Sequence, residues 1–318
     1  MSKNKILHNA TALLVIQIAN QLLPLLTVPY LTRALGVNAY GAYAYALAIV
    51  AIASVVTDFG FNLWATAEVA TNRDNRSRVQ QLYGAVTGAK ILLLCLCIPL
   101  ICFYAANSGI AVKYHFALYL SALPLIGLTL QPIWLFNGLE RMSYITIFVI
   151  ISRIAFLLLS LNLIASDNDL SLLMAINGLS QLIAAMLGVI ILAKLGYVPT
   201  QPKLKECCDV LKKAFPFFLS RLAVSTYSAG GAIFIGAVSG TRSVAIYSVA
   251  EQLYRGALAM LSPLSQVMYP YMVRTGNYRV LIRVIGGATL AACLGSALTA
   301  FFGVFVIRLL FGNDFMSA

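Results

Sequence analysis

Charged side chains interrupt several of the long apolar stretches of this sequence. In VAEQLYRGALAM, residues 249–260, Glu251 and Arg255 stand four residues apart, so on a helix they lie one turn apart on the same face. Other apolar stretches carry Arg221, Arg153, Lys90 and Asp58. A central Arg or Lys costs roughly 2.5–3.5 kcal/mol to place in a bilayer, so such residues usually face a protein interior or a water-filled cavity. The set predicts a cationic cavity that binds an anionic substrate.

Each of these basic residues also has a structural interpretation. Glu251 and Arg255 can simply neutralise each other as a structural i,i+4 pair. In the cavity interpretation, Glu251 instead orients Arg255 or offers a site for a coupling cation, H⁺ or Na⁺. Arg153 can cap the carbonyls of a neighbouring helix. Lys90 and Arg221 stand near the cytoplasmic ends of their apolar runs, so their long side chains can extend to the membrane surface. The sequence leaves both interpretations open for each residue.

Uncharged polar residues gather in the first apolar run. Gln17 and Gln21 share a helical face with Asn20 beside them, and Pro24 and Pro29 follow on the next turns. Proline bends a membrane helix and is tolerated where neighbours satisfy the freed carbonyls. We expect a helix that flexes as the cavity changes its exposure. A static kink with amide hydrogen bonds between helices is the alternative.

Motifs of enzyme catalysis and metal binding are absent from the sequence. It has no P-loop, no His-Glu-x-x-His motif and no Gly-x-Ser-x-Gly elbow, and its only histidines are His8 and His115. Four of the six cysteines lie in apolar runs, while Cys207 and Cys208 adjoin each other in a basic connection. We interpret them as reduced thiols. We therefore expect a protein that is not an enzyme and that has no metal site and no cofactor.

Composition places these residues in a membrane. Hydrophobic residues make up 61% of the chain and charged residues 10%, and the mean hydropathy is +0.88. Apolar runs of about 20 residues, the length at which a helix crosses the hydrocarbon core, recur along the chain. The pattern predicts an all-α polytopic membrane protein. Nine spans are predicted at 10–31, 42–64, 82–105, 116–136, 144–164, 170–192, 215–238, 245–269 and 281–307.

The distribution of basic residues indicates the topology. The chain has 22 Lys and Arg against 10 Asp and Glu. In the connections between spans, basic residues fall mainly on the N-terminal side, and the other side receives only Arg33, Lys113, Arg242 and Arg308. The positive-inside rule therefore predicts a cytoplasmic N-terminus. The basic excess is a topology signal and does not indicate nucleic-acid binding.

An internal repeat relates two connections between spans. LGVNAYGAYAYA (35–46) aligns with SGTRSVAIYSVA (239–250) at an offset of 204 residues, and the identities are Gly36 with Gly240, Tyr43 with Tyr247, and Ala46 with Ala250. Six spans fit in this offset, and an even number gives parallel repeats about an axis along the membrane normal. We expect an N-terminal lobe of six helices, 1–204, and half of a second lobe, three helices at 205–318. We interpret the chain as a fragment of a twelve-span protein, with a nine-span variant as the alternative.

Three segments carry a resemblance to a known family. LLPLLTVPYLTRALGVNAYGAYAYA (22–46), DFGFNLWATAEVA (58–70) and PLSQVMYPYMVR (263–274) resemble bacterial O-antigen and polysaccharide-repeat flippases. These belong to the multidrug/oligosaccharidyl-lipid/polysaccharide exporter superfamily. The chain departs from the family at Ala67, where a basic residue often precedes the acidic Glu68. We expect the corresponding cytoplasmic contact to be weaker or to move to Arg73.

The resemblance implies a V-shaped, two-lobed helical bundle with spans one, two, seven and eight lining a central cavity. Its implied substrate is an undecaprenyl-pyrophosphate-linked oligosaccharide, which alternating access carries from the cytoplasmic to the periplasmic leaflet of the bacterial inner membrane. Arg suits phosphate oxygens, and Gln and Asn suit sugar hydroxyls. Further implied partners are membrane lipids, a polysaccharide polymerase and a chain-length regulator. The predicted residues on the four lining spans are Gln17, Asn20, Gln21, Asp58, Arg221, Glu251 and Arg255.

Two other functions remain as alternatives. A cation-coupled multidrug exporter of the same superfamily is expected to have buried carboxylates and an aromatic, apolar cavity, whereas this chain has more deep basic residues than acidic ones. A membrane-embedded glycan polymerase or ligase generally needs a large external loop with polar catalytic residues, whereas the external connections here are short. Both comparisons favour the flippase.

Overall fold

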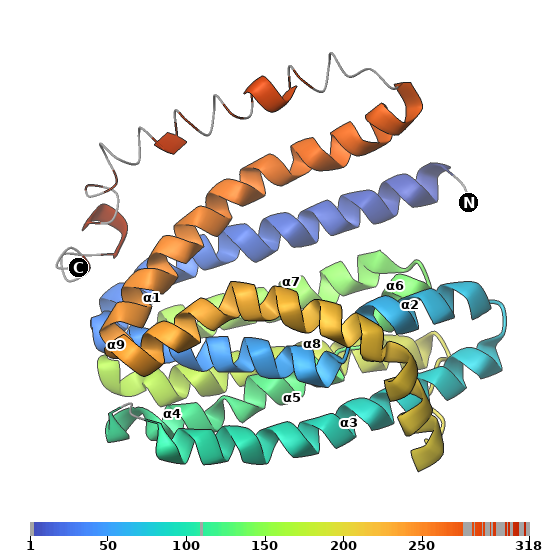
Figure 1. Cartoon of the computed structure of the whole chain (residues 1–318), viewed down its shortest axis with the longest axis horizontal. Coiled ribbons are helices and arrows are strands. Elements are labelled where there is room, and N and C mark those ends of the chain that lie inside the picture. The colour runs from blue at the N-terminus through green and yellow to red at the C-terminus, as the bar shows by residue number, and fades with distance from the viewer. Residues whose placement is uncertain are drawn as a thin grey trace.

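The protein is a bundle of helices (Figure 1). The computed structural model describes the backbone of residues 3–108 and 111–275 and isolated residues from 282 to 315. It describes the side chains of residues 24, 26–108, 111–226 and 229–256 and of isolated later positions. Within these residues there is no β-strand. The elements are α1 (Lys3–Asp58), α2 (Phe61–Asn72), α3 (Arg76–Asn107), η1 (Val112–Tyr114), α4 (His115–Leu120), α5 (Ala122–Leu130), α6 (Ile133–Gly138), α7 (Met142–Leu163), η2 (Asp167–Asp169), α8 (Leu170–Lys194) and α9 (Leu204–Thr275).

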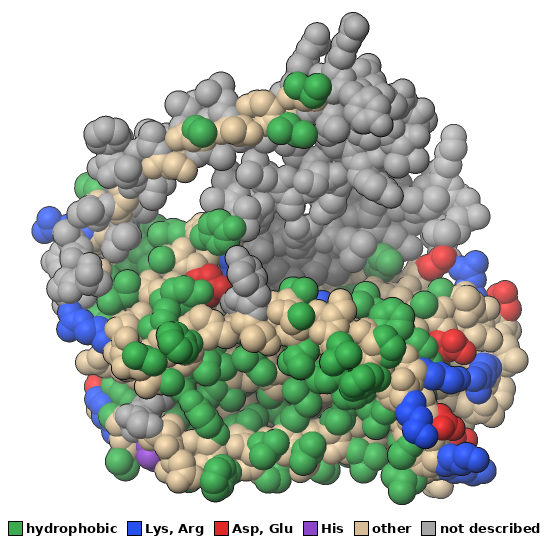
Figure 2. Space-filling view, in the orientation of Figure 1, with side chains coloured by type: hydrophobic (Ala, Val, Ile, Leu, Met, Phe, Trp, Pro, Cys, Tyr) green, Lys and Arg blue, Asp and Glu red, His purple; other side chains and the backbone are tan. Residues whose placement is uncertain are grey.

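The helices are long and apolar enough to cross a membrane. Six stretches of the described residues meet that condition: Leu26–Asn72, Arg76–Asn107, Val112–Gly138, Met142–Leu163, Asp167–Lys194 and Ala229–Gly256. In Figure 2, hydrophobic side chains cover the middle of the coloured surface, and charged side chains gather mostly toward its two ends. The prediction of an all-α polytopic membrane protein is confirmed. Most of predicted span nine lies outside the described residues.

Two predicted connections between spans are single-residue kinks. Spans one and two run together in α1, and spans seven and eight run together in α9. The interruptions are Gly36, with φ 72° and ψ 173°, and Gly240, with φ 78° and ψ 179°. Glycine adopts such positive φ values without the steric cost that a Cβ brings, so one residue is enough to turn the chain. Figure 1 shows α1 and α9 doubling back at the same end of the molecule.

The two kinked helices meet across a pseudo-two-fold axis. Gly41 of α1 packs against Thr241 and Ala245 of α9, and a Cβ added at Gly41 would lie 3.3 Å from the Ala245 Cβ. Gly41 and Ala245 are separated by 204 residues, the offset of the predicted repeat. Two positions that a two-fold axis relates can touch only if both lie beside that axis. The kinks at Gly36 and Gly240 and the contact of Gly41 with Ala245 therefore agree with the offset of 204 residues that was read from the sequence. The division into lobes 1–204 and 205–318 stays a prediction.

Polar side chains join helices inside the bundle. The Thr129 hydroxyl of α5 donates to Thr57 Oγ1 of α1 at 2.9 Å. The Ser152 hydroxyl of α7 donates to the Ser180 carbonyl of α8 at 2.7 Å. In a bilayer, helices associate through close packing and such hydrogen bonds, each worth about 0.6–2 kcal/mol. The first contact holds α5 against α1, and the second holds α7 against α8.

Lys90 and Asp58 form a buried ion pair between α3 and the end of α1. Lys90 Nζ lies 3.3 Å from Asp58 Oδ1, and the two side chains are only 6% and 13% exposed. The Asn62 amide also donates to Asp58 Oδ1, at 2.7 Å. Lys90 therefore does not extend to the membrane surface. A buried charge that loses its partner is strongly destabilising, which accounts for the close pairing.

A break in the helix follows this ion pair directly and divides predicted span two. Phe59 has φ 45° and Gly60 has φ 78°, and these two residues separate α1 from α2. The Phe59 ring stacks on the Phe218 ring of α9, with centroids 4.4 Å apart and planes 7° apart. A Cβ at Gly60 would lie 2.7 Å from the Phe218 nitrogen, so glycine is required there by space as well as by conformation. The break is thus a contact point between the N-terminal helices and α9.

We expect Lys90→Met to destabilise the protein by about 3–5 kcal/mol, because it leaves the Asp58 carboxylate buried without its counter-ion. Thermal unfolding of the purified protein in detergent measures this loss. The matched control is Lys113→Met, which breaks the exposed pair of Lys113 with Asp167, whose side chains are 56% and 48% exposed, and should change the melting temperature little. Equal, small effects of both substitutions would contradict a stabilising role for the buried pair.

Candidate functional site

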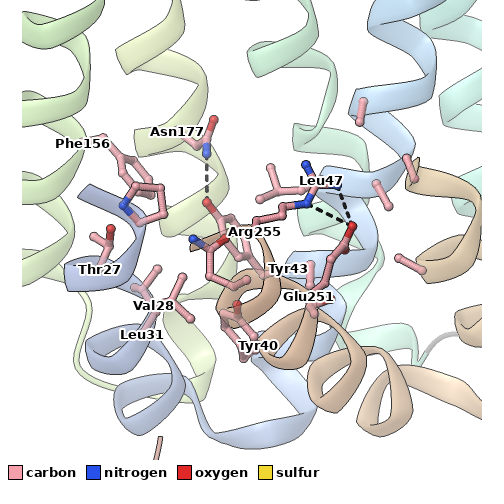
Figure 3. Close-up of a pocket in the computed structure, with 18 of the residues that line it drawn as sticks. Thr27, Val28, Leu31, Tyr40, Tyr43, Leu47, Phe156, Asn177, Glu251 and Arg255 are labelled. Carbon is pink, nitrogen blue, oxygen red and sulfur yellow. Dashed lines mark hydrogen bonds and ion pairs between the residues drawn. The ribbon is translucent and has the colours of Figure 1, made fainter. Parts of the chain in front are cut away.

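A cavity of about 330 Å³ lies between α1, α7, α8 and α9 (Figure 3). Its volume is at the lower end of the range for small-molecule sites, roughly 300–1,000 Å³. Helix α1 contributes to its wall on both sides of the Gly36 kink. The lining residues are Pro24, Thr27, Val28, Leu31, Tyr40, Tyr43, Ala44, Leu47, Ala48, Ala51, Arg153, Phe156, Asn177, Ala229, Ala232, Ser248, Glu251, Gln252 and Arg255.

Repeat-related residues line opposite walls of this cavity. Five pairs at the offset of 204 residues are present: Val28 with Ala232, Ala44 with Ser248, Leu47 with Glu251, Ala48 with Gln252, and Ala51 with Arg255. The cavity therefore lies across the pseudo-two-fold axis. Its α1 wall is apolar at the two positions where its α9 wall carries a carboxylate and a guanidinium. The two walls are formed by repeat-related positions, but their side chains differ in charge.

Glu251 and Arg255 pair on the α9 wall, as their spacing predicts. Arg255 Nη2 lies 2.6 Å from Glu251 Oε1, and Arg255 Nε donates to the same oxygen at 3.1 Å. The arginine side chain is 50% exposed and the glutamate side chain 24%. Both reach into the cavity in Figure 3. The pair is accessible from the cavity, in contrast to the enclosed pair of Lys90 with Asp58.

Arg153 brings a second guanidinium to the cavity, from α7. Within the described part of the chain it forms no ion pair and no hydrogen bond to a carbonyl, so the predicted helix-capping alternative is not what the structure shows there. It interacts electrostatically with the Tyr43 phenol of α1. Two cations from different helices thus converge on one small cavity.

Uncharged polar groups complete the wall. The Asn177 amide of α8 donates to the Tyr43 hydroxyl at 2.9 Å, and the Tyr40 ring lies beside Tyr43 with centroids 6.4 Å apart. Sequence reasoning missed Tyr40, Tyr43, Asn177 and Gln252 as lining residues. Tyr43 was available as one of the repeat identities, and Gln252 as a polar neighbour of Glu251 in the same apolar stretch. Nothing in the sequence marked Asn177 beyond its being an amide in an apolar run.

The structure brings together three of the predicted site residues. Glu251, Arg255 and Arg153 line the cavity. Arg221 is exposed on α9 and does not line it, in agreement with the alternative that its side chain extends outward. Lys90 and Asp58 pair between α3 and α1, also outside the cavity. The side chains of Gln17, Asn20 and Gln21 lie outside the described residues.

Arg73, to which the departure at Ala67 was expected to move a cytoplasmic contact, forms an ion pair, and its partner is not Glu68. Arg73 pairs with Glu140 at 2.8 Å, and Arg78 is the basic residue near Glu68, at 3.9 Å. Arg73 follows the end of α2, and the chain after α6 brings Glu140 to it. Sequence proximity to Glu68 therefore did not decide its partner.

One of the two adjacent cysteines has the environment of an unreactive thiol. Cys207 is buried and Cys208 is exposed. Burial raises the pKa of the Cys207 thiol, which lowers the fraction of the thiolate that binds metals and reacts. Among the described residues, no group of three or more His, Cys, Asp and Glu side chains is placed to hold a metal ion.

Comparison with known proteins identifies relatives. A family described as "Polysaccharide biosynthesis protein" matches residues 6–276. A protein of Escherichia coli K12 named "Putative O-antigen transporter" is 31% identical over 322 residues, which cover 99% of this chain and 76% of the relative. A Shigella dysenteriae protein of the same name is 27% identical over 315 residues, which cover 96% of this chain and 78% of the relative. No solved structure matches.

We expect Tyr43→Phe to lower the melting temperature, because it removes the acceptor of the Asn177 amide and leaves that donor unsatisfied, at a cost of about 1–3 kcal/mol. The matched control is Tyr247→Phe at the repeat-related position, where the hydroxyl has no hydrogen-bond partner among the described residues. Thermal unfolding in detergent compares the two. Equal shifts would show that the bond between Tyr43 and Asn177 does not stabilise the cavity wall.

Proposed function

Because the chain belongs to the polysaccharide biosynthesis protein family, we propose that it is a flippase for undecaprenyl-pyrophosphate-linked oligosaccharide repeat units. It carries them from the cytoplasmic to the periplasmic leaflet of the bacterial inner membrane, for O-antigen or related surface polysaccharide. Its relatives are named as O-antigen transporters, which supports transport rather than catalysis. The charge distribution in the connections supports a cytoplasmic N-terminus.

The observation that carries this proposal is the convergence of Arg153 and Arg255 on one cavity. A guanidinium presents a planar fork of N–H donors that matches phosphate oxygens, and a pyrophosphate offers two such groups. The remaining polar groups are hydroxyls and amides, including Tyr43 and Asn177, which can donate to and accept from sugar hydroxyls. The cavity thus suits a ligand that joins an anionic centre to a neutral, hydroxyl-rich group.

Transport requires the cavity to change its exposure. A volume of about 330 Å³ suits a pyrophosphate with its nearest neighbours and is small for a whole repeat unit. The helices that enclose it, α1 and α9, are each interrupted by one glycine kink and meet across the pseudo-two-fold axis. We propose that these halves rock about the axis, which opens the cavity to one leaflet and then to the other.

The alternative functions fit the cavity less well. A cation-coupled multidrug exporter is expected to have buried carboxylates and an aromatic, apolar cavity, whereas two guanidinium groups and one carboxylate line this cavity among the described residues. A glycan polymerase or ligase requires polar catalytic residues on an external loop. The described external connections are the glycine kinks and short segments around η1 and η2. If transport is coupled to H⁺ or Na⁺, Glu251 is the carboxylate in the cavity that would bind the cation.

Deletion of the gene tests the class of function. We expect loss of surface polysaccharide together with accumulation of lipid-linked repeat units on the cytoplasmic leaflet, measured in the same cells. Normal polysaccharide with raised sensitivity to cationic dyes would indicate the exporter instead. Complete repeat units that reach the periplasm and stay unpolymerised would indicate the enzyme.

Substitution of the cavity arginines tests the site. In the full-length gene, we expect Arg255→Ala and Arg153→Ala to abolish surface polysaccharide, and Arg255→Lys to retain part of it, because lysine keeps the charge without the planar fork. Arg221→Ala is the matched control, since Arg221 is exposed outside the cavity, and it should support normal polysaccharide. Normal transport by a well-inserted Arg255→Ala protein would contradict the role of Arg255.

A further inference from the structure

Glu251 occupies one of the two donor forks through which Arg255 can bind an anionic ligand. Both Nε and Nη2 of Arg255 are directed at one oxygen of Glu251, at 3.1 and 2.6 Å. These two nitrogens form one of the donor forks through which a guanidinium binds a carboxylate or a phosphate. A phosphate that approaches this fork must displace the Glu251 carboxylate.

Arg153 is in a different state in the same cavity. It has no carboxylate partner within the described residues, although it lines the cavity as Arg255 does. The cavity therefore combines one guanidinium that is occupied by an internal carboxylate with one that is open to a ligand. An anionic group that first contacts Arg153 would next meet the Glu251–Arg255 pair.

We infer that Glu251 is an internal competitor for the anionic group of the substrate. It holds Arg255 while the cavity is empty, gives up Arg255 when a phosphate binds, and takes it back when the substrate leaves. Each change exchanges one ion pair for another, and no covalent bond forms or breaks. The inference rests on the proposed function, because it takes the ligand of the cavity to be anionic.

The exposure of the pair permits this exchange. The Arg255 side chain is 50% exposed and that of Glu251 is 24% exposed, so water can solvate both groups while they separate. The enclosed pair of Lys90 with Asp58, 6% and 13% exposed, lacks this access. Partly exposed ion pairs are weak, and their strength corresponds to a roughly two- to fivefold change in an equilibrium constant. A competitor of that strength lowers ligand affinity without preventing binding.

The test measures binding of farnesyl pyrophosphate, a soluble isoprenoid pyrophosphate, to the purified full chain by isothermal titration calorimetry. Glu251→Gln should bind it roughly two- to fivefold more tightly than the unsubstituted protein at neutral pH. Glu251→Ala, a second variant without the carboxylate, should also bind more tightly, and Arg255→Ala more weakly.

Asp167→Asn is the matched control, because it also removes a carboxylate from an exposed ion pair, with Lys113, but far from the cavity lining. It should leave the affinity unchanged. Equal or weaker binding by folded Glu251→Gln and Glu251→Ala proteins would contradict the inference that Glu251 competes with the ligand for Arg255, and would not affect the proposed function. If neither the unsubstituted protein nor any variant binds the probe, the cavity does not bind an isoprenoid pyrophosphate, and the proposed function is contradicted as well.

Discussion

The cost of removing a charge from water governs the arrangement of this helical bundle. Its interior and its surroundings are both apolar, so each ionisable side chain must find a counter-ion, reach the surface or face a water-accessible space. The described residues show all three solutions. Lys90 and Asp58 enclose each other, Arg221 is exposed, and Arg153 faces the cavity beside the pair of Glu251 and Arg255. The degree of enclosure separates charges that fix the structure from charges that remain available to a ligand.

The predicted internal repeat explains how a cavity with unlike walls can arise. The kinks at Gly36 and Gly240 and the contact of Gly41 with Ala245 place equivalent positions of the two halves around one axis. Leu47 and Glu251 then face the same space from opposite sides. Because each half supplies its own side chain at an equivalent place, one wall can stay apolar while the other becomes charged, and the backbone need not change.

Much of the fold could be predicted from the sequence, because hydrocarbon imposes a length and an apolar composition on each spanning helix. The repeat offset was also readable and correctly paired Gly36 with Gly240. What the sequence could not provide was conformation at single residues and the rotation of each helix about its axis. A glycine between apolar runs is compatible with a loop as well as with a kink. For the same reason, the depth of Lys90 was predictable, but its partner Asp58, 32 residues earlier on another helix, depended on which faces meet.

The glycine kinks also limit how the helices can move. No atom lies within 4 Å of a Cβ added at Gly36 or Gly240, so space does not restrict these residues, and their backbone torsions alone join the two arms of each helix. A one-residue joint places no flexible loop between the two arms, so a change in its torsions turns one arm about a fixed pivot. Both pivots lie at the same end of the molecule (Figure 1). When an arm rotates by a few degrees about its pivot, the displacement of its residues grows with their distance from the pivot. The displacement is therefore largest at the opposite end of the molecule.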